Sequence, residues 1–233
     1  MKVLCYGSLN LDHIYNVLEF IRPGETLQAL SVEQHCGGKG FNQAVAAAKA
    51  GLPVYLAGCI GPDGGIFREI CRTVGVDDTY LHEENLPTGS AVIQVNQRGE
   101  NCILLYGGAN QTVTEEQIEQ TLGNFQPGDV LIAQNEISQL PKLLSCAEKR
   151  GLRIAWNPSP MNEKITPDML SSVNWLFVNE VEAEQLCGSN QPEICLDRLS
   201  ALCPKGAVIL TLGSAGSCYA GPEGHFFQPA FSV

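Results

Sequence analysis

Short runs of β-branched and other apolar residues alternate along the chain with longer stretches of helical character. Strands that alternate with helices pair in parallel and are covered by those helices, so this pattern predicts an α/β fold with a mostly parallel central sheet. Central strands are expected at residues 3–6, 54–59, 130–133, 153–156, 175–178 and 207–212. Helices are expected at residues 40–50, 64–74, 114–122, 140–149, 181–186 and 194–202.

Several of the expected helices carry end signals. Gly51 and Gly151 each stand just past a helical stretch, where glycine readily adopts the left-handed conformation that stops a helix. Thr114 and Gln117 have the spacing of a capping box at a helix start.

Two regions break the alternation. Residues 12–20 and 26–35 are extended and mixed with no helix between them, and residues 89–95 and 101–106 form a hairpin pattern that turns at residues 96–99. Together they predict a small separate β-sheet, a lid of about residues 12–36 and 88–106 that covers one end of the main sheet. Since the chain shows no repeat and no flexible linker, residues 1–233 are interpreted as a single domain with a lid.

Composition narrows the class of protein. The chain has 14 Lys and Arg against 25 Asp and Glu, a formal charge of -11, which argues against non-specific nucleic-acid binding. A local group of N–H donors with one Lys and a metal can still hold an anionic ligand. The ten cysteines include no C-x-x-C pair and lie mostly in apolar runs, which favours reduced thiols. With no signal-peptide pattern and no apolar run near ~20 residues, we expect a soluble cytoplasmic protein without membrane partners.

Asn10 and Asp12 follow the first expected strand. Ligands of open α/β sheets bind beyond the carboxyl ends of the strands, and two side chains two residues apart point to the same side of an extended chain. An amide beside a carboxylate suits a polyol, which offers many hydroxyl donors and acceptors. Taken alone, the pair is more simply interpreted as an Asx turn that closes the strand.

A glycine-rich turn at residues 37–40 opens an Ala-rich helix. Glycines let the backbone approach a ligand closely, and the free N–H groups of a helix start attract anions. The spacing is that of neither a Walker A loop nor a G-x-G-x-x-G dinucleotide turn, so a Rossmann-type oxidoreductase is disfavoured. A structural turn ahead of a tightly packed helix is the alternative.

The strings GSLNLDH at residues 7–13 and GGKGFNQA at residues 37–44 closely resemble the ribokinase-like members of the PfkB carbohydrate kinase family. The resemblance continues in order along essentially the whole chain. It includes GGAN at 107–110, Glu136, NPSP at 157–160, NEVEAE at 179–184 and TLGSAG at 211–216.

The resemblance implies a ribokinase-like three-layer α/β/α fold with a β-sheet lid, use of ATP and Mg²⁺, and transfer of the γ-phosphoryl group to a primary sugar hydroxyl. By position, the pentose-binding residues are Asn10, Asp12, Gly38, Lys39, Asn42 and Glu136. The residues expected at the nucleotide are Asn179, Thr211, Gly213 and Gly216, with Glu182 expected at Mg²⁺. The alternatives are that Glu182 is a solvated acid in the first turn of a helix and that Glu136 is an acid of a loop.

Family members continue beyond the position of Val233 into a Gly-Ala-Gly-Asp-like segment, whose Asp is the general base. The resemblance therefore places no catalytic residue among these 233 residues, and it places the remaining walls of the adenine pocket and a monovalent-cation site of intact homologues beyond Val233 as well. Because base and anion-binding N–H groups act together in phosphoryl transfer, little turnover is expected from these residues alone.

The first functional hypothesis is a kinase that converts D-ribose to ribose 5-phosphate. The alternatives within the family are a fructokinase, a sugar-phosphate kinase, a deoxyribokinase and a nucleoside kinase, and a non-catalytic sugar-binding remnant is the alternative outside catalysis. Sugar-phosphate kinases need several cations at the site, where only Lys39 is expected, and nucleosides need a wider apolar platform. A homodimer through the β lid is a further expectation from the resemblance.

Overall fold

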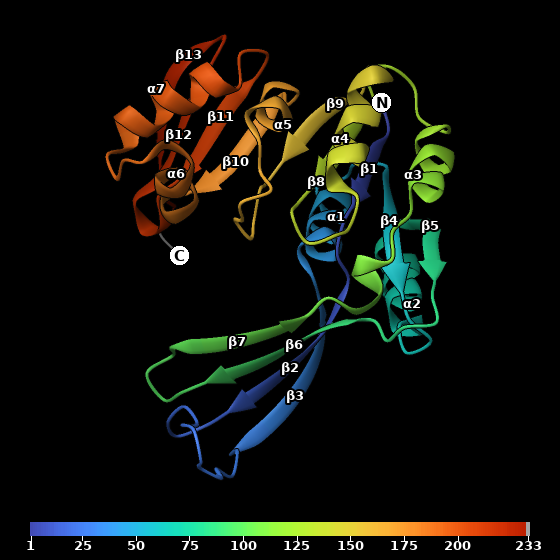
Figure 1. Cartoon of the computed structure of the whole chain (residues 1–233), viewed down its shortest axis with the longest axis vertical. Coiled ribbons are helices and arrows are strands. Elements are labelled where there is room, and N and C mark those ends of the chain that lie inside the picture. The colour runs from blue at the N-terminus through green and yellow to red at the C-terminus, as the bar shows by residue number, and fades with distance from the viewer. Residues whose placement is uncertain (232–233) are drawn as a thin grey trace. The chain divides into compact units, whose positions relative to one another are not determined.

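Strands and helices alternate along most of the chain, as the hydrophobic pattern predicts (Figure 1). The computed structural model describes residues 1–231, and contacts among them separate two units. The first unit holds Met1–Tyr6, Thr114–Asn135 and the chain from Gln139 onward, and the second holds Gly7–Val113 and Glu136–Ser138.

The first unit is built on a sheet whose strands run in the order β13-β12-β11-β10-β9-β8-β1. From β1 to β11 the neighbouring strands pair in parallel, and β12 and β13 are antiparallel additions. The strand bounds are β1 Val3–Tyr6, β8 Val130–Ala133, β9 Arg153–Trp156, β10 Trp175–Asn179, β11 Ala207–Thr211, β12 Gly216–Gly221 and β13 Gly224–Pro229.

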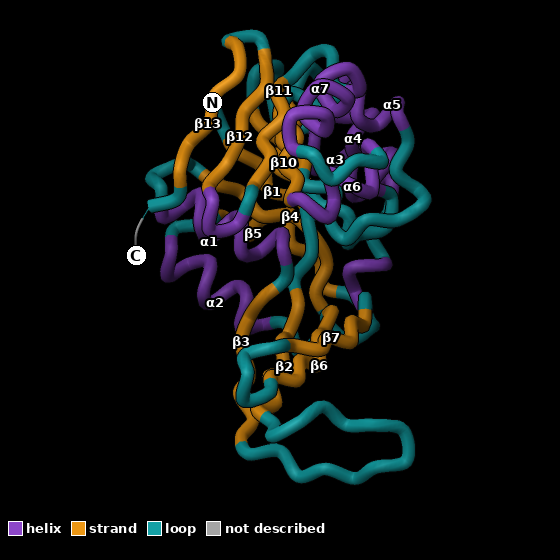
Figure 2. Tube along the Cα trace, turned by 90° about the vertical axis from the view of Figure 1, so that its left-hand side faces the viewer, coloured by secondary structure: helices purple, strands orange, loops and turns teal. Residues whose placement is uncertain are grey.

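The helices of the first unit lie on one side of this sheet (Figure 2). They are α3 Glu115–Leu122, α4 Leu140–Lys149, α5 Pro167–Ser171, α6 Glu180–Cys187 and α7 Pro192–Leu202, with a 3-10 turn η2 at Gly213–Ala215. Their apolar side chains are buried, as at Leu143 of α4 and Leu199 of α7. The capping box predicted at Thr114 and Gln117 is confirmed at the start of α3.

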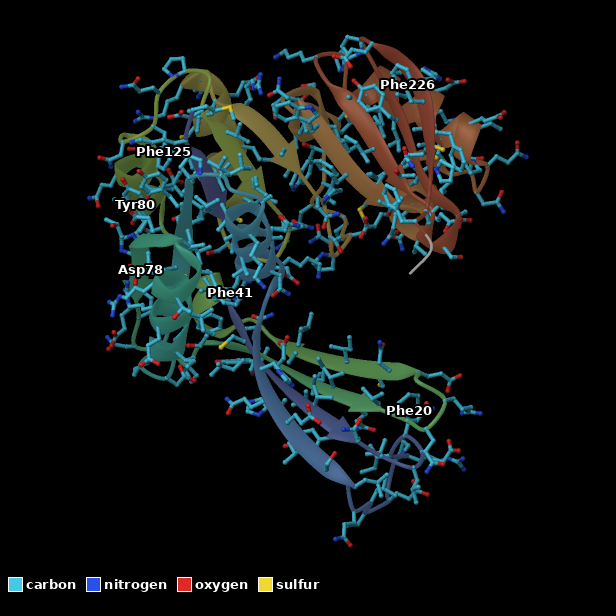
Figure 3. All side chains as sticks on the ribbon, turned by 180° about the vertical axis from the view of Figure 1, so that it is seen from behind. Phe20, Phe41, Asp78, Tyr80, Phe125 and Phe226 are labelled. Atoms are coloured by element: carbon cyan, nitrogen blue, oxygen red, sulfur yellow. The ribbon has the colours of Figure 1, made fainter. Side chains whose placement is uncertain are left out.

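The second unit packs α1 (Lys39–Lys49) and α2 (Gly65–Val74) with the parallel strands β4 (Val54–Ile60) and β5 (Asp77–Glu83). Phe41 of α1, labelled in Figure 3, meets Phe67 of α2 edge to face with ring centroids 4.9 Å apart. Both rings are buried, so they form part of the core that fixes the start of α1.

A separate small sheet completes the second unit, with strands in the order β3-β2-β6-β7 (Figure 1). These strands are β2 Asn10–Asn16, β3 Ser31–Gly37, β6 Gly89–Val95 and β7 Asn101–Tyr106, and a 3-10 turn η1 follows at Gly108–Gln111. The predicted hairpin is confirmed with the expected bounds, and Gly99 in its turn has a φ of 77°. Strand β2 pairs antiparallel with β3 and parallel with β6.

The predicted α/β class with a mostly parallel main sheet and a second small sheet is therefore confirmed. Besides the two 3-10 turns, the sequence pattern does not predict four elements: β5, α5, β12 and β13. Strand β5 opens on two aspartates and a threonine, residues typical of turns, and every residue of β13 is exposed, so neither carries a buried apolar alternation.

Among the described residues no helix has the length and apolar character to cross a membrane.

Candidate functional site

Asn10 and Asp12 lie at the start of β2, on the same face of the small sheet, as their spacing predicts. Asn10 is buried and Asp12 is half-buried. In the sheet register, Asn10 stands opposite Gly37 on β3 and opposite Gly89 on β6. Asn10 is therefore flanked by a glycine on each neighbouring strand, whereas Asp12 stands opposite His35 on β3 and Ala91 on β6.

These glycines leave the space that the polar side chains occupy. A Cβ atom on Gly37 would lie 1.9 Å from Oδ2 of Asp12, and a Cβ atom on Gly89 would lie 2.4 Å from Oδ1 of Asn10. Any larger residue at either position would displace a candidate ligand-binding group.

The glycine-rich turn joins β3 to α1. Gly38 is the N-cap residue with a φ of 91°, a left-handed conformation that favours glycine, and its Cβ atom would lie 2.6 Å from the carbonyl oxygen of Ser8. That carbonyl accepts a 3.0 Å hydrogen bond from the N–H of Phe41. The start of α1, with Lys39 as its first residue, is thus held against the loop that leads into β2.

Glu136 comes from a distant part of the sequence and meets Lys39. Its Oε1 lies 2.9 Å from Nζ of Lys39, and its Oε2 accepts bonds from the backbone N–H of Lys39 at 3.3 Å and from the hydroxyl of Ser8. Only 9% of the Glu136 side chain is exposed, against 37% for Lys39. Although Glu136 lies in a loop, its carboxylate is held by three donors.

The charges in this cluster act on the carboxyl group of Asp12. Burial and then the negative charge of Glu136 raise the pKa of Asp12, while His13, His35 and Lys39 partly lower it. Two carboxylates therefore share one lysine, and the cluster carries no surplus of positive charge.

All six predicted sugar-site residues lie in the second unit. Asn42 is the fourth residue of α1: its N–H donates to the carbonyl of Gly38 at 3.0 Å, and its exposed side chain makes no hydrogen bond to another residue of the described chain.

Two further residues at this cluster, Ser8 and Asn110, are not singled out as site residues by the sequence. Asn110 is 2% exposed, and its Nδ2 donates to Oδ1 of Asn10 at 2.8 Å and to the carbonyl of Leu9 at 3.1 Å. Its Oδ1 accepts from the N–H of Leu9 at 3.0 Å. The only signal was the GGAN string, which ends at Asn110.

The second predicted group lies in the first unit, at the start of α6. Asn179 is the N-cap residue, and its Oδ1 accepts from the N–H of Glu182 at 2.8 Å. Glu182 reciprocates: its Oε2 accepts from the N–H of Asn179 at 3.0 Å and from Nδ2 of Asn157 at 3.4 Å. Because Glu182 is 7% exposed, it is not a solvated acid.

Residues 211–216 follow β11 in the same unit. Thr211 donates its hydroxyl to the carbonyl of Val178 at 3.4 Å. Gly213 has a φ of 53°, and a Cβ atom built on it would meet nothing within 4 Å. A Cβ atom on Gly216 would lie 2.1 Å from the carbonyl oxygen of Gln228, so this glycine is required by the pairing of β12 with β13. Of these two glycines, Gly213 therefore has open space beside it and Gly216 does not.

The residues of the first unit fit a hydrated magnesium ion. No cluster of three or more His, Cys, Asp or Glu side chains suited to a metal occurs within residues 1–231. Mg²⁺ keeps several of its waters and is commonly held through one or two carboxylates. Glu182 offers one such carboxylate, and in the described chain no donor holds its Oε1.

Comparison with known proteins decides the family. The family described as pfkB family carbohydrate kinase matches residues 1–233. The chain is a PfkB-family carbohydrate kinase. This confirms the family that the sequence motifs indicated.

Individual relatives agree with that assignment. The ribokinase of Haemophilus influenzae is 35% identical over 219 residues, which cover 90% of this chain and 71% of that enzyme. A deoxyribokinase of Salmonella typhi is 30% identical over 248 residues, covering 100% of this chain and 79% of the relative. A structure of Arabidopsis thaliana ribokinase complexed with ribose and ATP superimposes with a TM-score of 0.84 at 26% identity, covering 98% of this chain and 77% of that one.

Proposed function

We propose that this PfkB-family chain is an ATP-dependent kinase that transfers the γ-phosphoryl group of ATP to a primary hydroxyl of a pentose, D-ribose in the first place. The observation that carries the proposal is the cluster of Asn10, Asp12, Lys39 and Glu136 in the second unit. The relatives named ribokinase, and the Arabidopsis structure with ribose and ATP, support the same substrate.

The cluster suits a neutral polyol. Asp12 and Glu136 offer acceptors, Lys39 offers a cationic donor, and Asn10 keeps its Nδ2 to donate because its Oδ1 already accepts from Asn110. A sugar phosphate would place a further negative charge beside two carboxylates with one lysine to offset them. The charge of the cluster therefore favours a free sugar.

In this proposal the nucleotide is bound by Asn179, Thr211, Gly213 and Gly216, and Mg²⁺ by Glu182 through its waters. Magnesium, when bound, neutralises charge that develops on the phosphate oxygens during transfer. The chain's own contribution is to hold the Glu182 carboxylate in a fixed position through the N–H of Asn179 and the amide of Asn157.

The small sheet is proposed to act as the lid over the sugar and as the contact of a homodimer. Its strand β7 exposes a row of apolar side chains, with Leu104 72% exposed. Analytical ultracentrifugation tests the dimer, and Leu104→Glu is expected to yield a monomer.

A deoxyribokinase is the second candidate, because the Salmonella relative matches the whole of this chain. D-Ribose and 2-deoxy-D-ribose differ by one hydroxyl, so their relative affinities separate the two functions. Sites built to hydrogen-bond a hydroxyl reject the analogue that lacks it.

Isothermal titration calorimetry with D-ribose, 2-deoxy-D-ribose and D-fructose tests the proposal, each with and without ATP and Mg²⁺. We expect the tightest binding for D-ribose, its loss in Asp12→Ala, and no change in Asp168→Ala, a control in the first turn of α5. The proposal fails when none of the sugars binds.

A coupled ADP-release assay then measures whether the chain transfers phosphoryl groups to the sugar. Sugar binding without nucleotide binding would favour the non-catalytic alternative. The expectation of low turnover from these residues alone stays a prediction, which the same assay tests.

A further inference from the structure

Two cysteine thiols are in contact where α6 connects to α7. Cys187 is the last residue of α6, Cys195 lies in α7, and their sulfur atoms are 2.8 Å apart. Both are free thiols. Because the sulfurs of a disulfide are about 2.05 Å apart, bond formation needs an approach of roughly 0.8 Å.

The chain between the two helices wraps around this pair. Gly188 ends α6 in the left-handed conformation with a φ of 70°, and α7 begins at Pro192. The carbonyl oxygen of Ser189 lies 3.6 Å from the sulfur of Cys187 and 2.9 Å from that of Cys195. The short connection therefore directs both thiols toward one point.

The two thiols differ in access to solvent. Cys187 is half-buried, whereas Cys195 is 2% exposed. Burial, followed by the contact with Cys187, raises the pKa of Cys195 to about 11. Since peroxides react with accessible thiolates, Cys187 is the thiol that a peroxide meets first and Cys195 is the resolving thiol.

We propose that Cys187 and Cys195 form a redox-sensitive pair that closes a reversible disulfide across the α6–α7 connection when the protein meets hydrogen peroxide. The Cys187 thiolate attacks one peroxide oxygen, the O–O bond breaks, and protonation of the leaving hydroxide gives water and a sulfenic acid. The Cys195 sulfur then attacks the Cys187 sulfur, and its proton leaves with the hydroxyl as a second water. Two thiols are oxidised and one peroxide is reduced to two waters.

The bond would tie the end of α6 to α7. Helix α6 begins beside Asn179 and carries Glu182, so the disulfide would fix the helix on which these residues stand. The proposal itself does not depend on the proposed kinase function, because it rests on the two thiols alone.

The sequence makes the bond directly measurable. Trypsin cleaves after Lys164 and Arg198, so one peptide contains Cys187 and Cys195 and no other cysteine. A Glu-specific protease then cuts after Glu193, between the two. The full chain is treated with increasing hydrogen peroxide, alkylated with N-ethylmaleimide and mapped by mass spectrometry.

We expect residues 165–198 to lose two hydrogens and to escape alkylation, and Glu193 cleavage to leave the two halves joined until a thiol reductant is added. Cys187→Ser and Cys195→Ser should each abolish the bond, while Cys102→Ser, at an exposed cysteine of β7, should leave it unchanged. The wild-type map decides the question even where a variant folds poorly. Alkylation of both thiols under conditions that oxidise Cys102 would overturn the proposal, as would pairing of either thiol with another cysteine.

Discussion

Asn110 donates its side-chain N–H to the side-chain carbonyl of Asn10 across 2.8 Å. The same Asn110 side chain closes two hydrogen bonds with the backbone of Leu9, the residue before Asn10. One buried amide therefore fixes both the path of the loop and the orientation of the Asn10 amide. This makes Asn110 a positioning residue for the proposed sugar site.

Asn110→Ala should weaken D-ribose binding about tenfold, because a hydrogen bond of this kind contributes on the order of 1 kcal/mol. It should also lower the free energy of unfolding by about 1–3 kcal/mol, since the backbone groups of Leu9 lose their partner in a buried place. Calorimetry and urea unfolding measure the two effects.

Asn10→Ala separates these effects, because it removes the ligand-facing amide and leaves the Leu9 bonds in place. Asn16→Ala, at the far end of β2, is the control for the strand. A wild-type ribose affinity in a folded Asn110→Ala protein would contradict the positioning role.

Glu136→Gln tests the buried carboxylate. The amide keeps an acceptor for Lys39 and loses the charge, so we expect ribose affinity to fall about tenfold and the free energy of unfolding to fall by about 1 kcal/mol, an effect limited by the exposure of Lys39. Glu148→Gln is the matched control, because Glu148 pairs with Lys205 at 2.6 Å with 42% of its side chain exposed. It should change stability by less than about 0.5 kcal/mol and leave ribose binding unaffected. Equal effects of the two substitutions in urea unfolding would refute the role given to Glu136.

Much of the fold could be predicted from sequence, and the successes share a cause. The bounds of α4, β8 and β9 agree with expectation, because each presents buried apolar residues between clear end signals. Strand β5 has no such alternation, since it exposes polar residues on an edge, and it was missed.

The site was harder to predict because its contacts are long in sequence. The spacing of Asn10 and Asp12 placed them on one face, which depends only on local geometry. Glu136 meets Lys39 across 97 positions, and Asn110 meets Asn10 across 100. No local pattern encodes those pairs, so only the family resemblance indicates Glu136, and nothing in the local sequence indicates the role of Asn110.

Asp12 should give stability a characteristic dependence on pH. Its pKa in the folded chain is raised above the ordinary 3.8, so the folded state binds the proton more tightly than the unfolded state does. The contribution of Asp12 to stability is therefore largest below pH 3.8 and is lost as the pH rises through the raised pKa. Asp12→Asn should gain stability relative to wild type across that window, while ribose binding is weakened. Thermal melts of the wild type and of Asp12→Asn, taken at steps of roughly one pH unit between about pH 3 and about pH 7, measure the difference in stability.

Asp63 is a control, because its pKa is shifted in the opposite direction from that of Asp12. Burial raises its pKa, but the hydroxyl and backbone N–H of Thr88, which donate to it at 2.7 and 2.8 Å, outweigh this and lower the pKa overall. Its stabilisation is present above the unfolded pKa and is lost as the pH falls through the lowered one, so Asp63→Asn should lose stability relative to wild type as the pH rises. Parallel pH trends in the two variants would count against the electrostatic account of Asp12.

Glu182 belongs to the capping box of α6 and is also proposed to bind magnesium. One substitution separates these two roles. A capping box works with Gln as well as Glu at its third helical position, so Glu182→Gln should keep the bonds with Asn179 and change stability by less than about 0.5 kcal/mol. It removes the negative charge that a divalent cation requires, so the Mg²⁺-dependent part of ATP affinity should fall at least about tenfold.

Glu182→Ala should lose both the capping bonds and the Mg²⁺-dependent part of ATP affinity. The loss of the cap should cost about 1 kcal/mol of stability. Gln117→Ala, at the same position of the α3 capping box, should show the stability cost alone. Titrations of ATP with and without Mg²⁺, set beside thermal melts, measure the two quantities independently. Unchanged magnesium dependence in Glu182→Gln would leave Glu182 with a capping role only, because the charge would then contribute nothing that the amide does not.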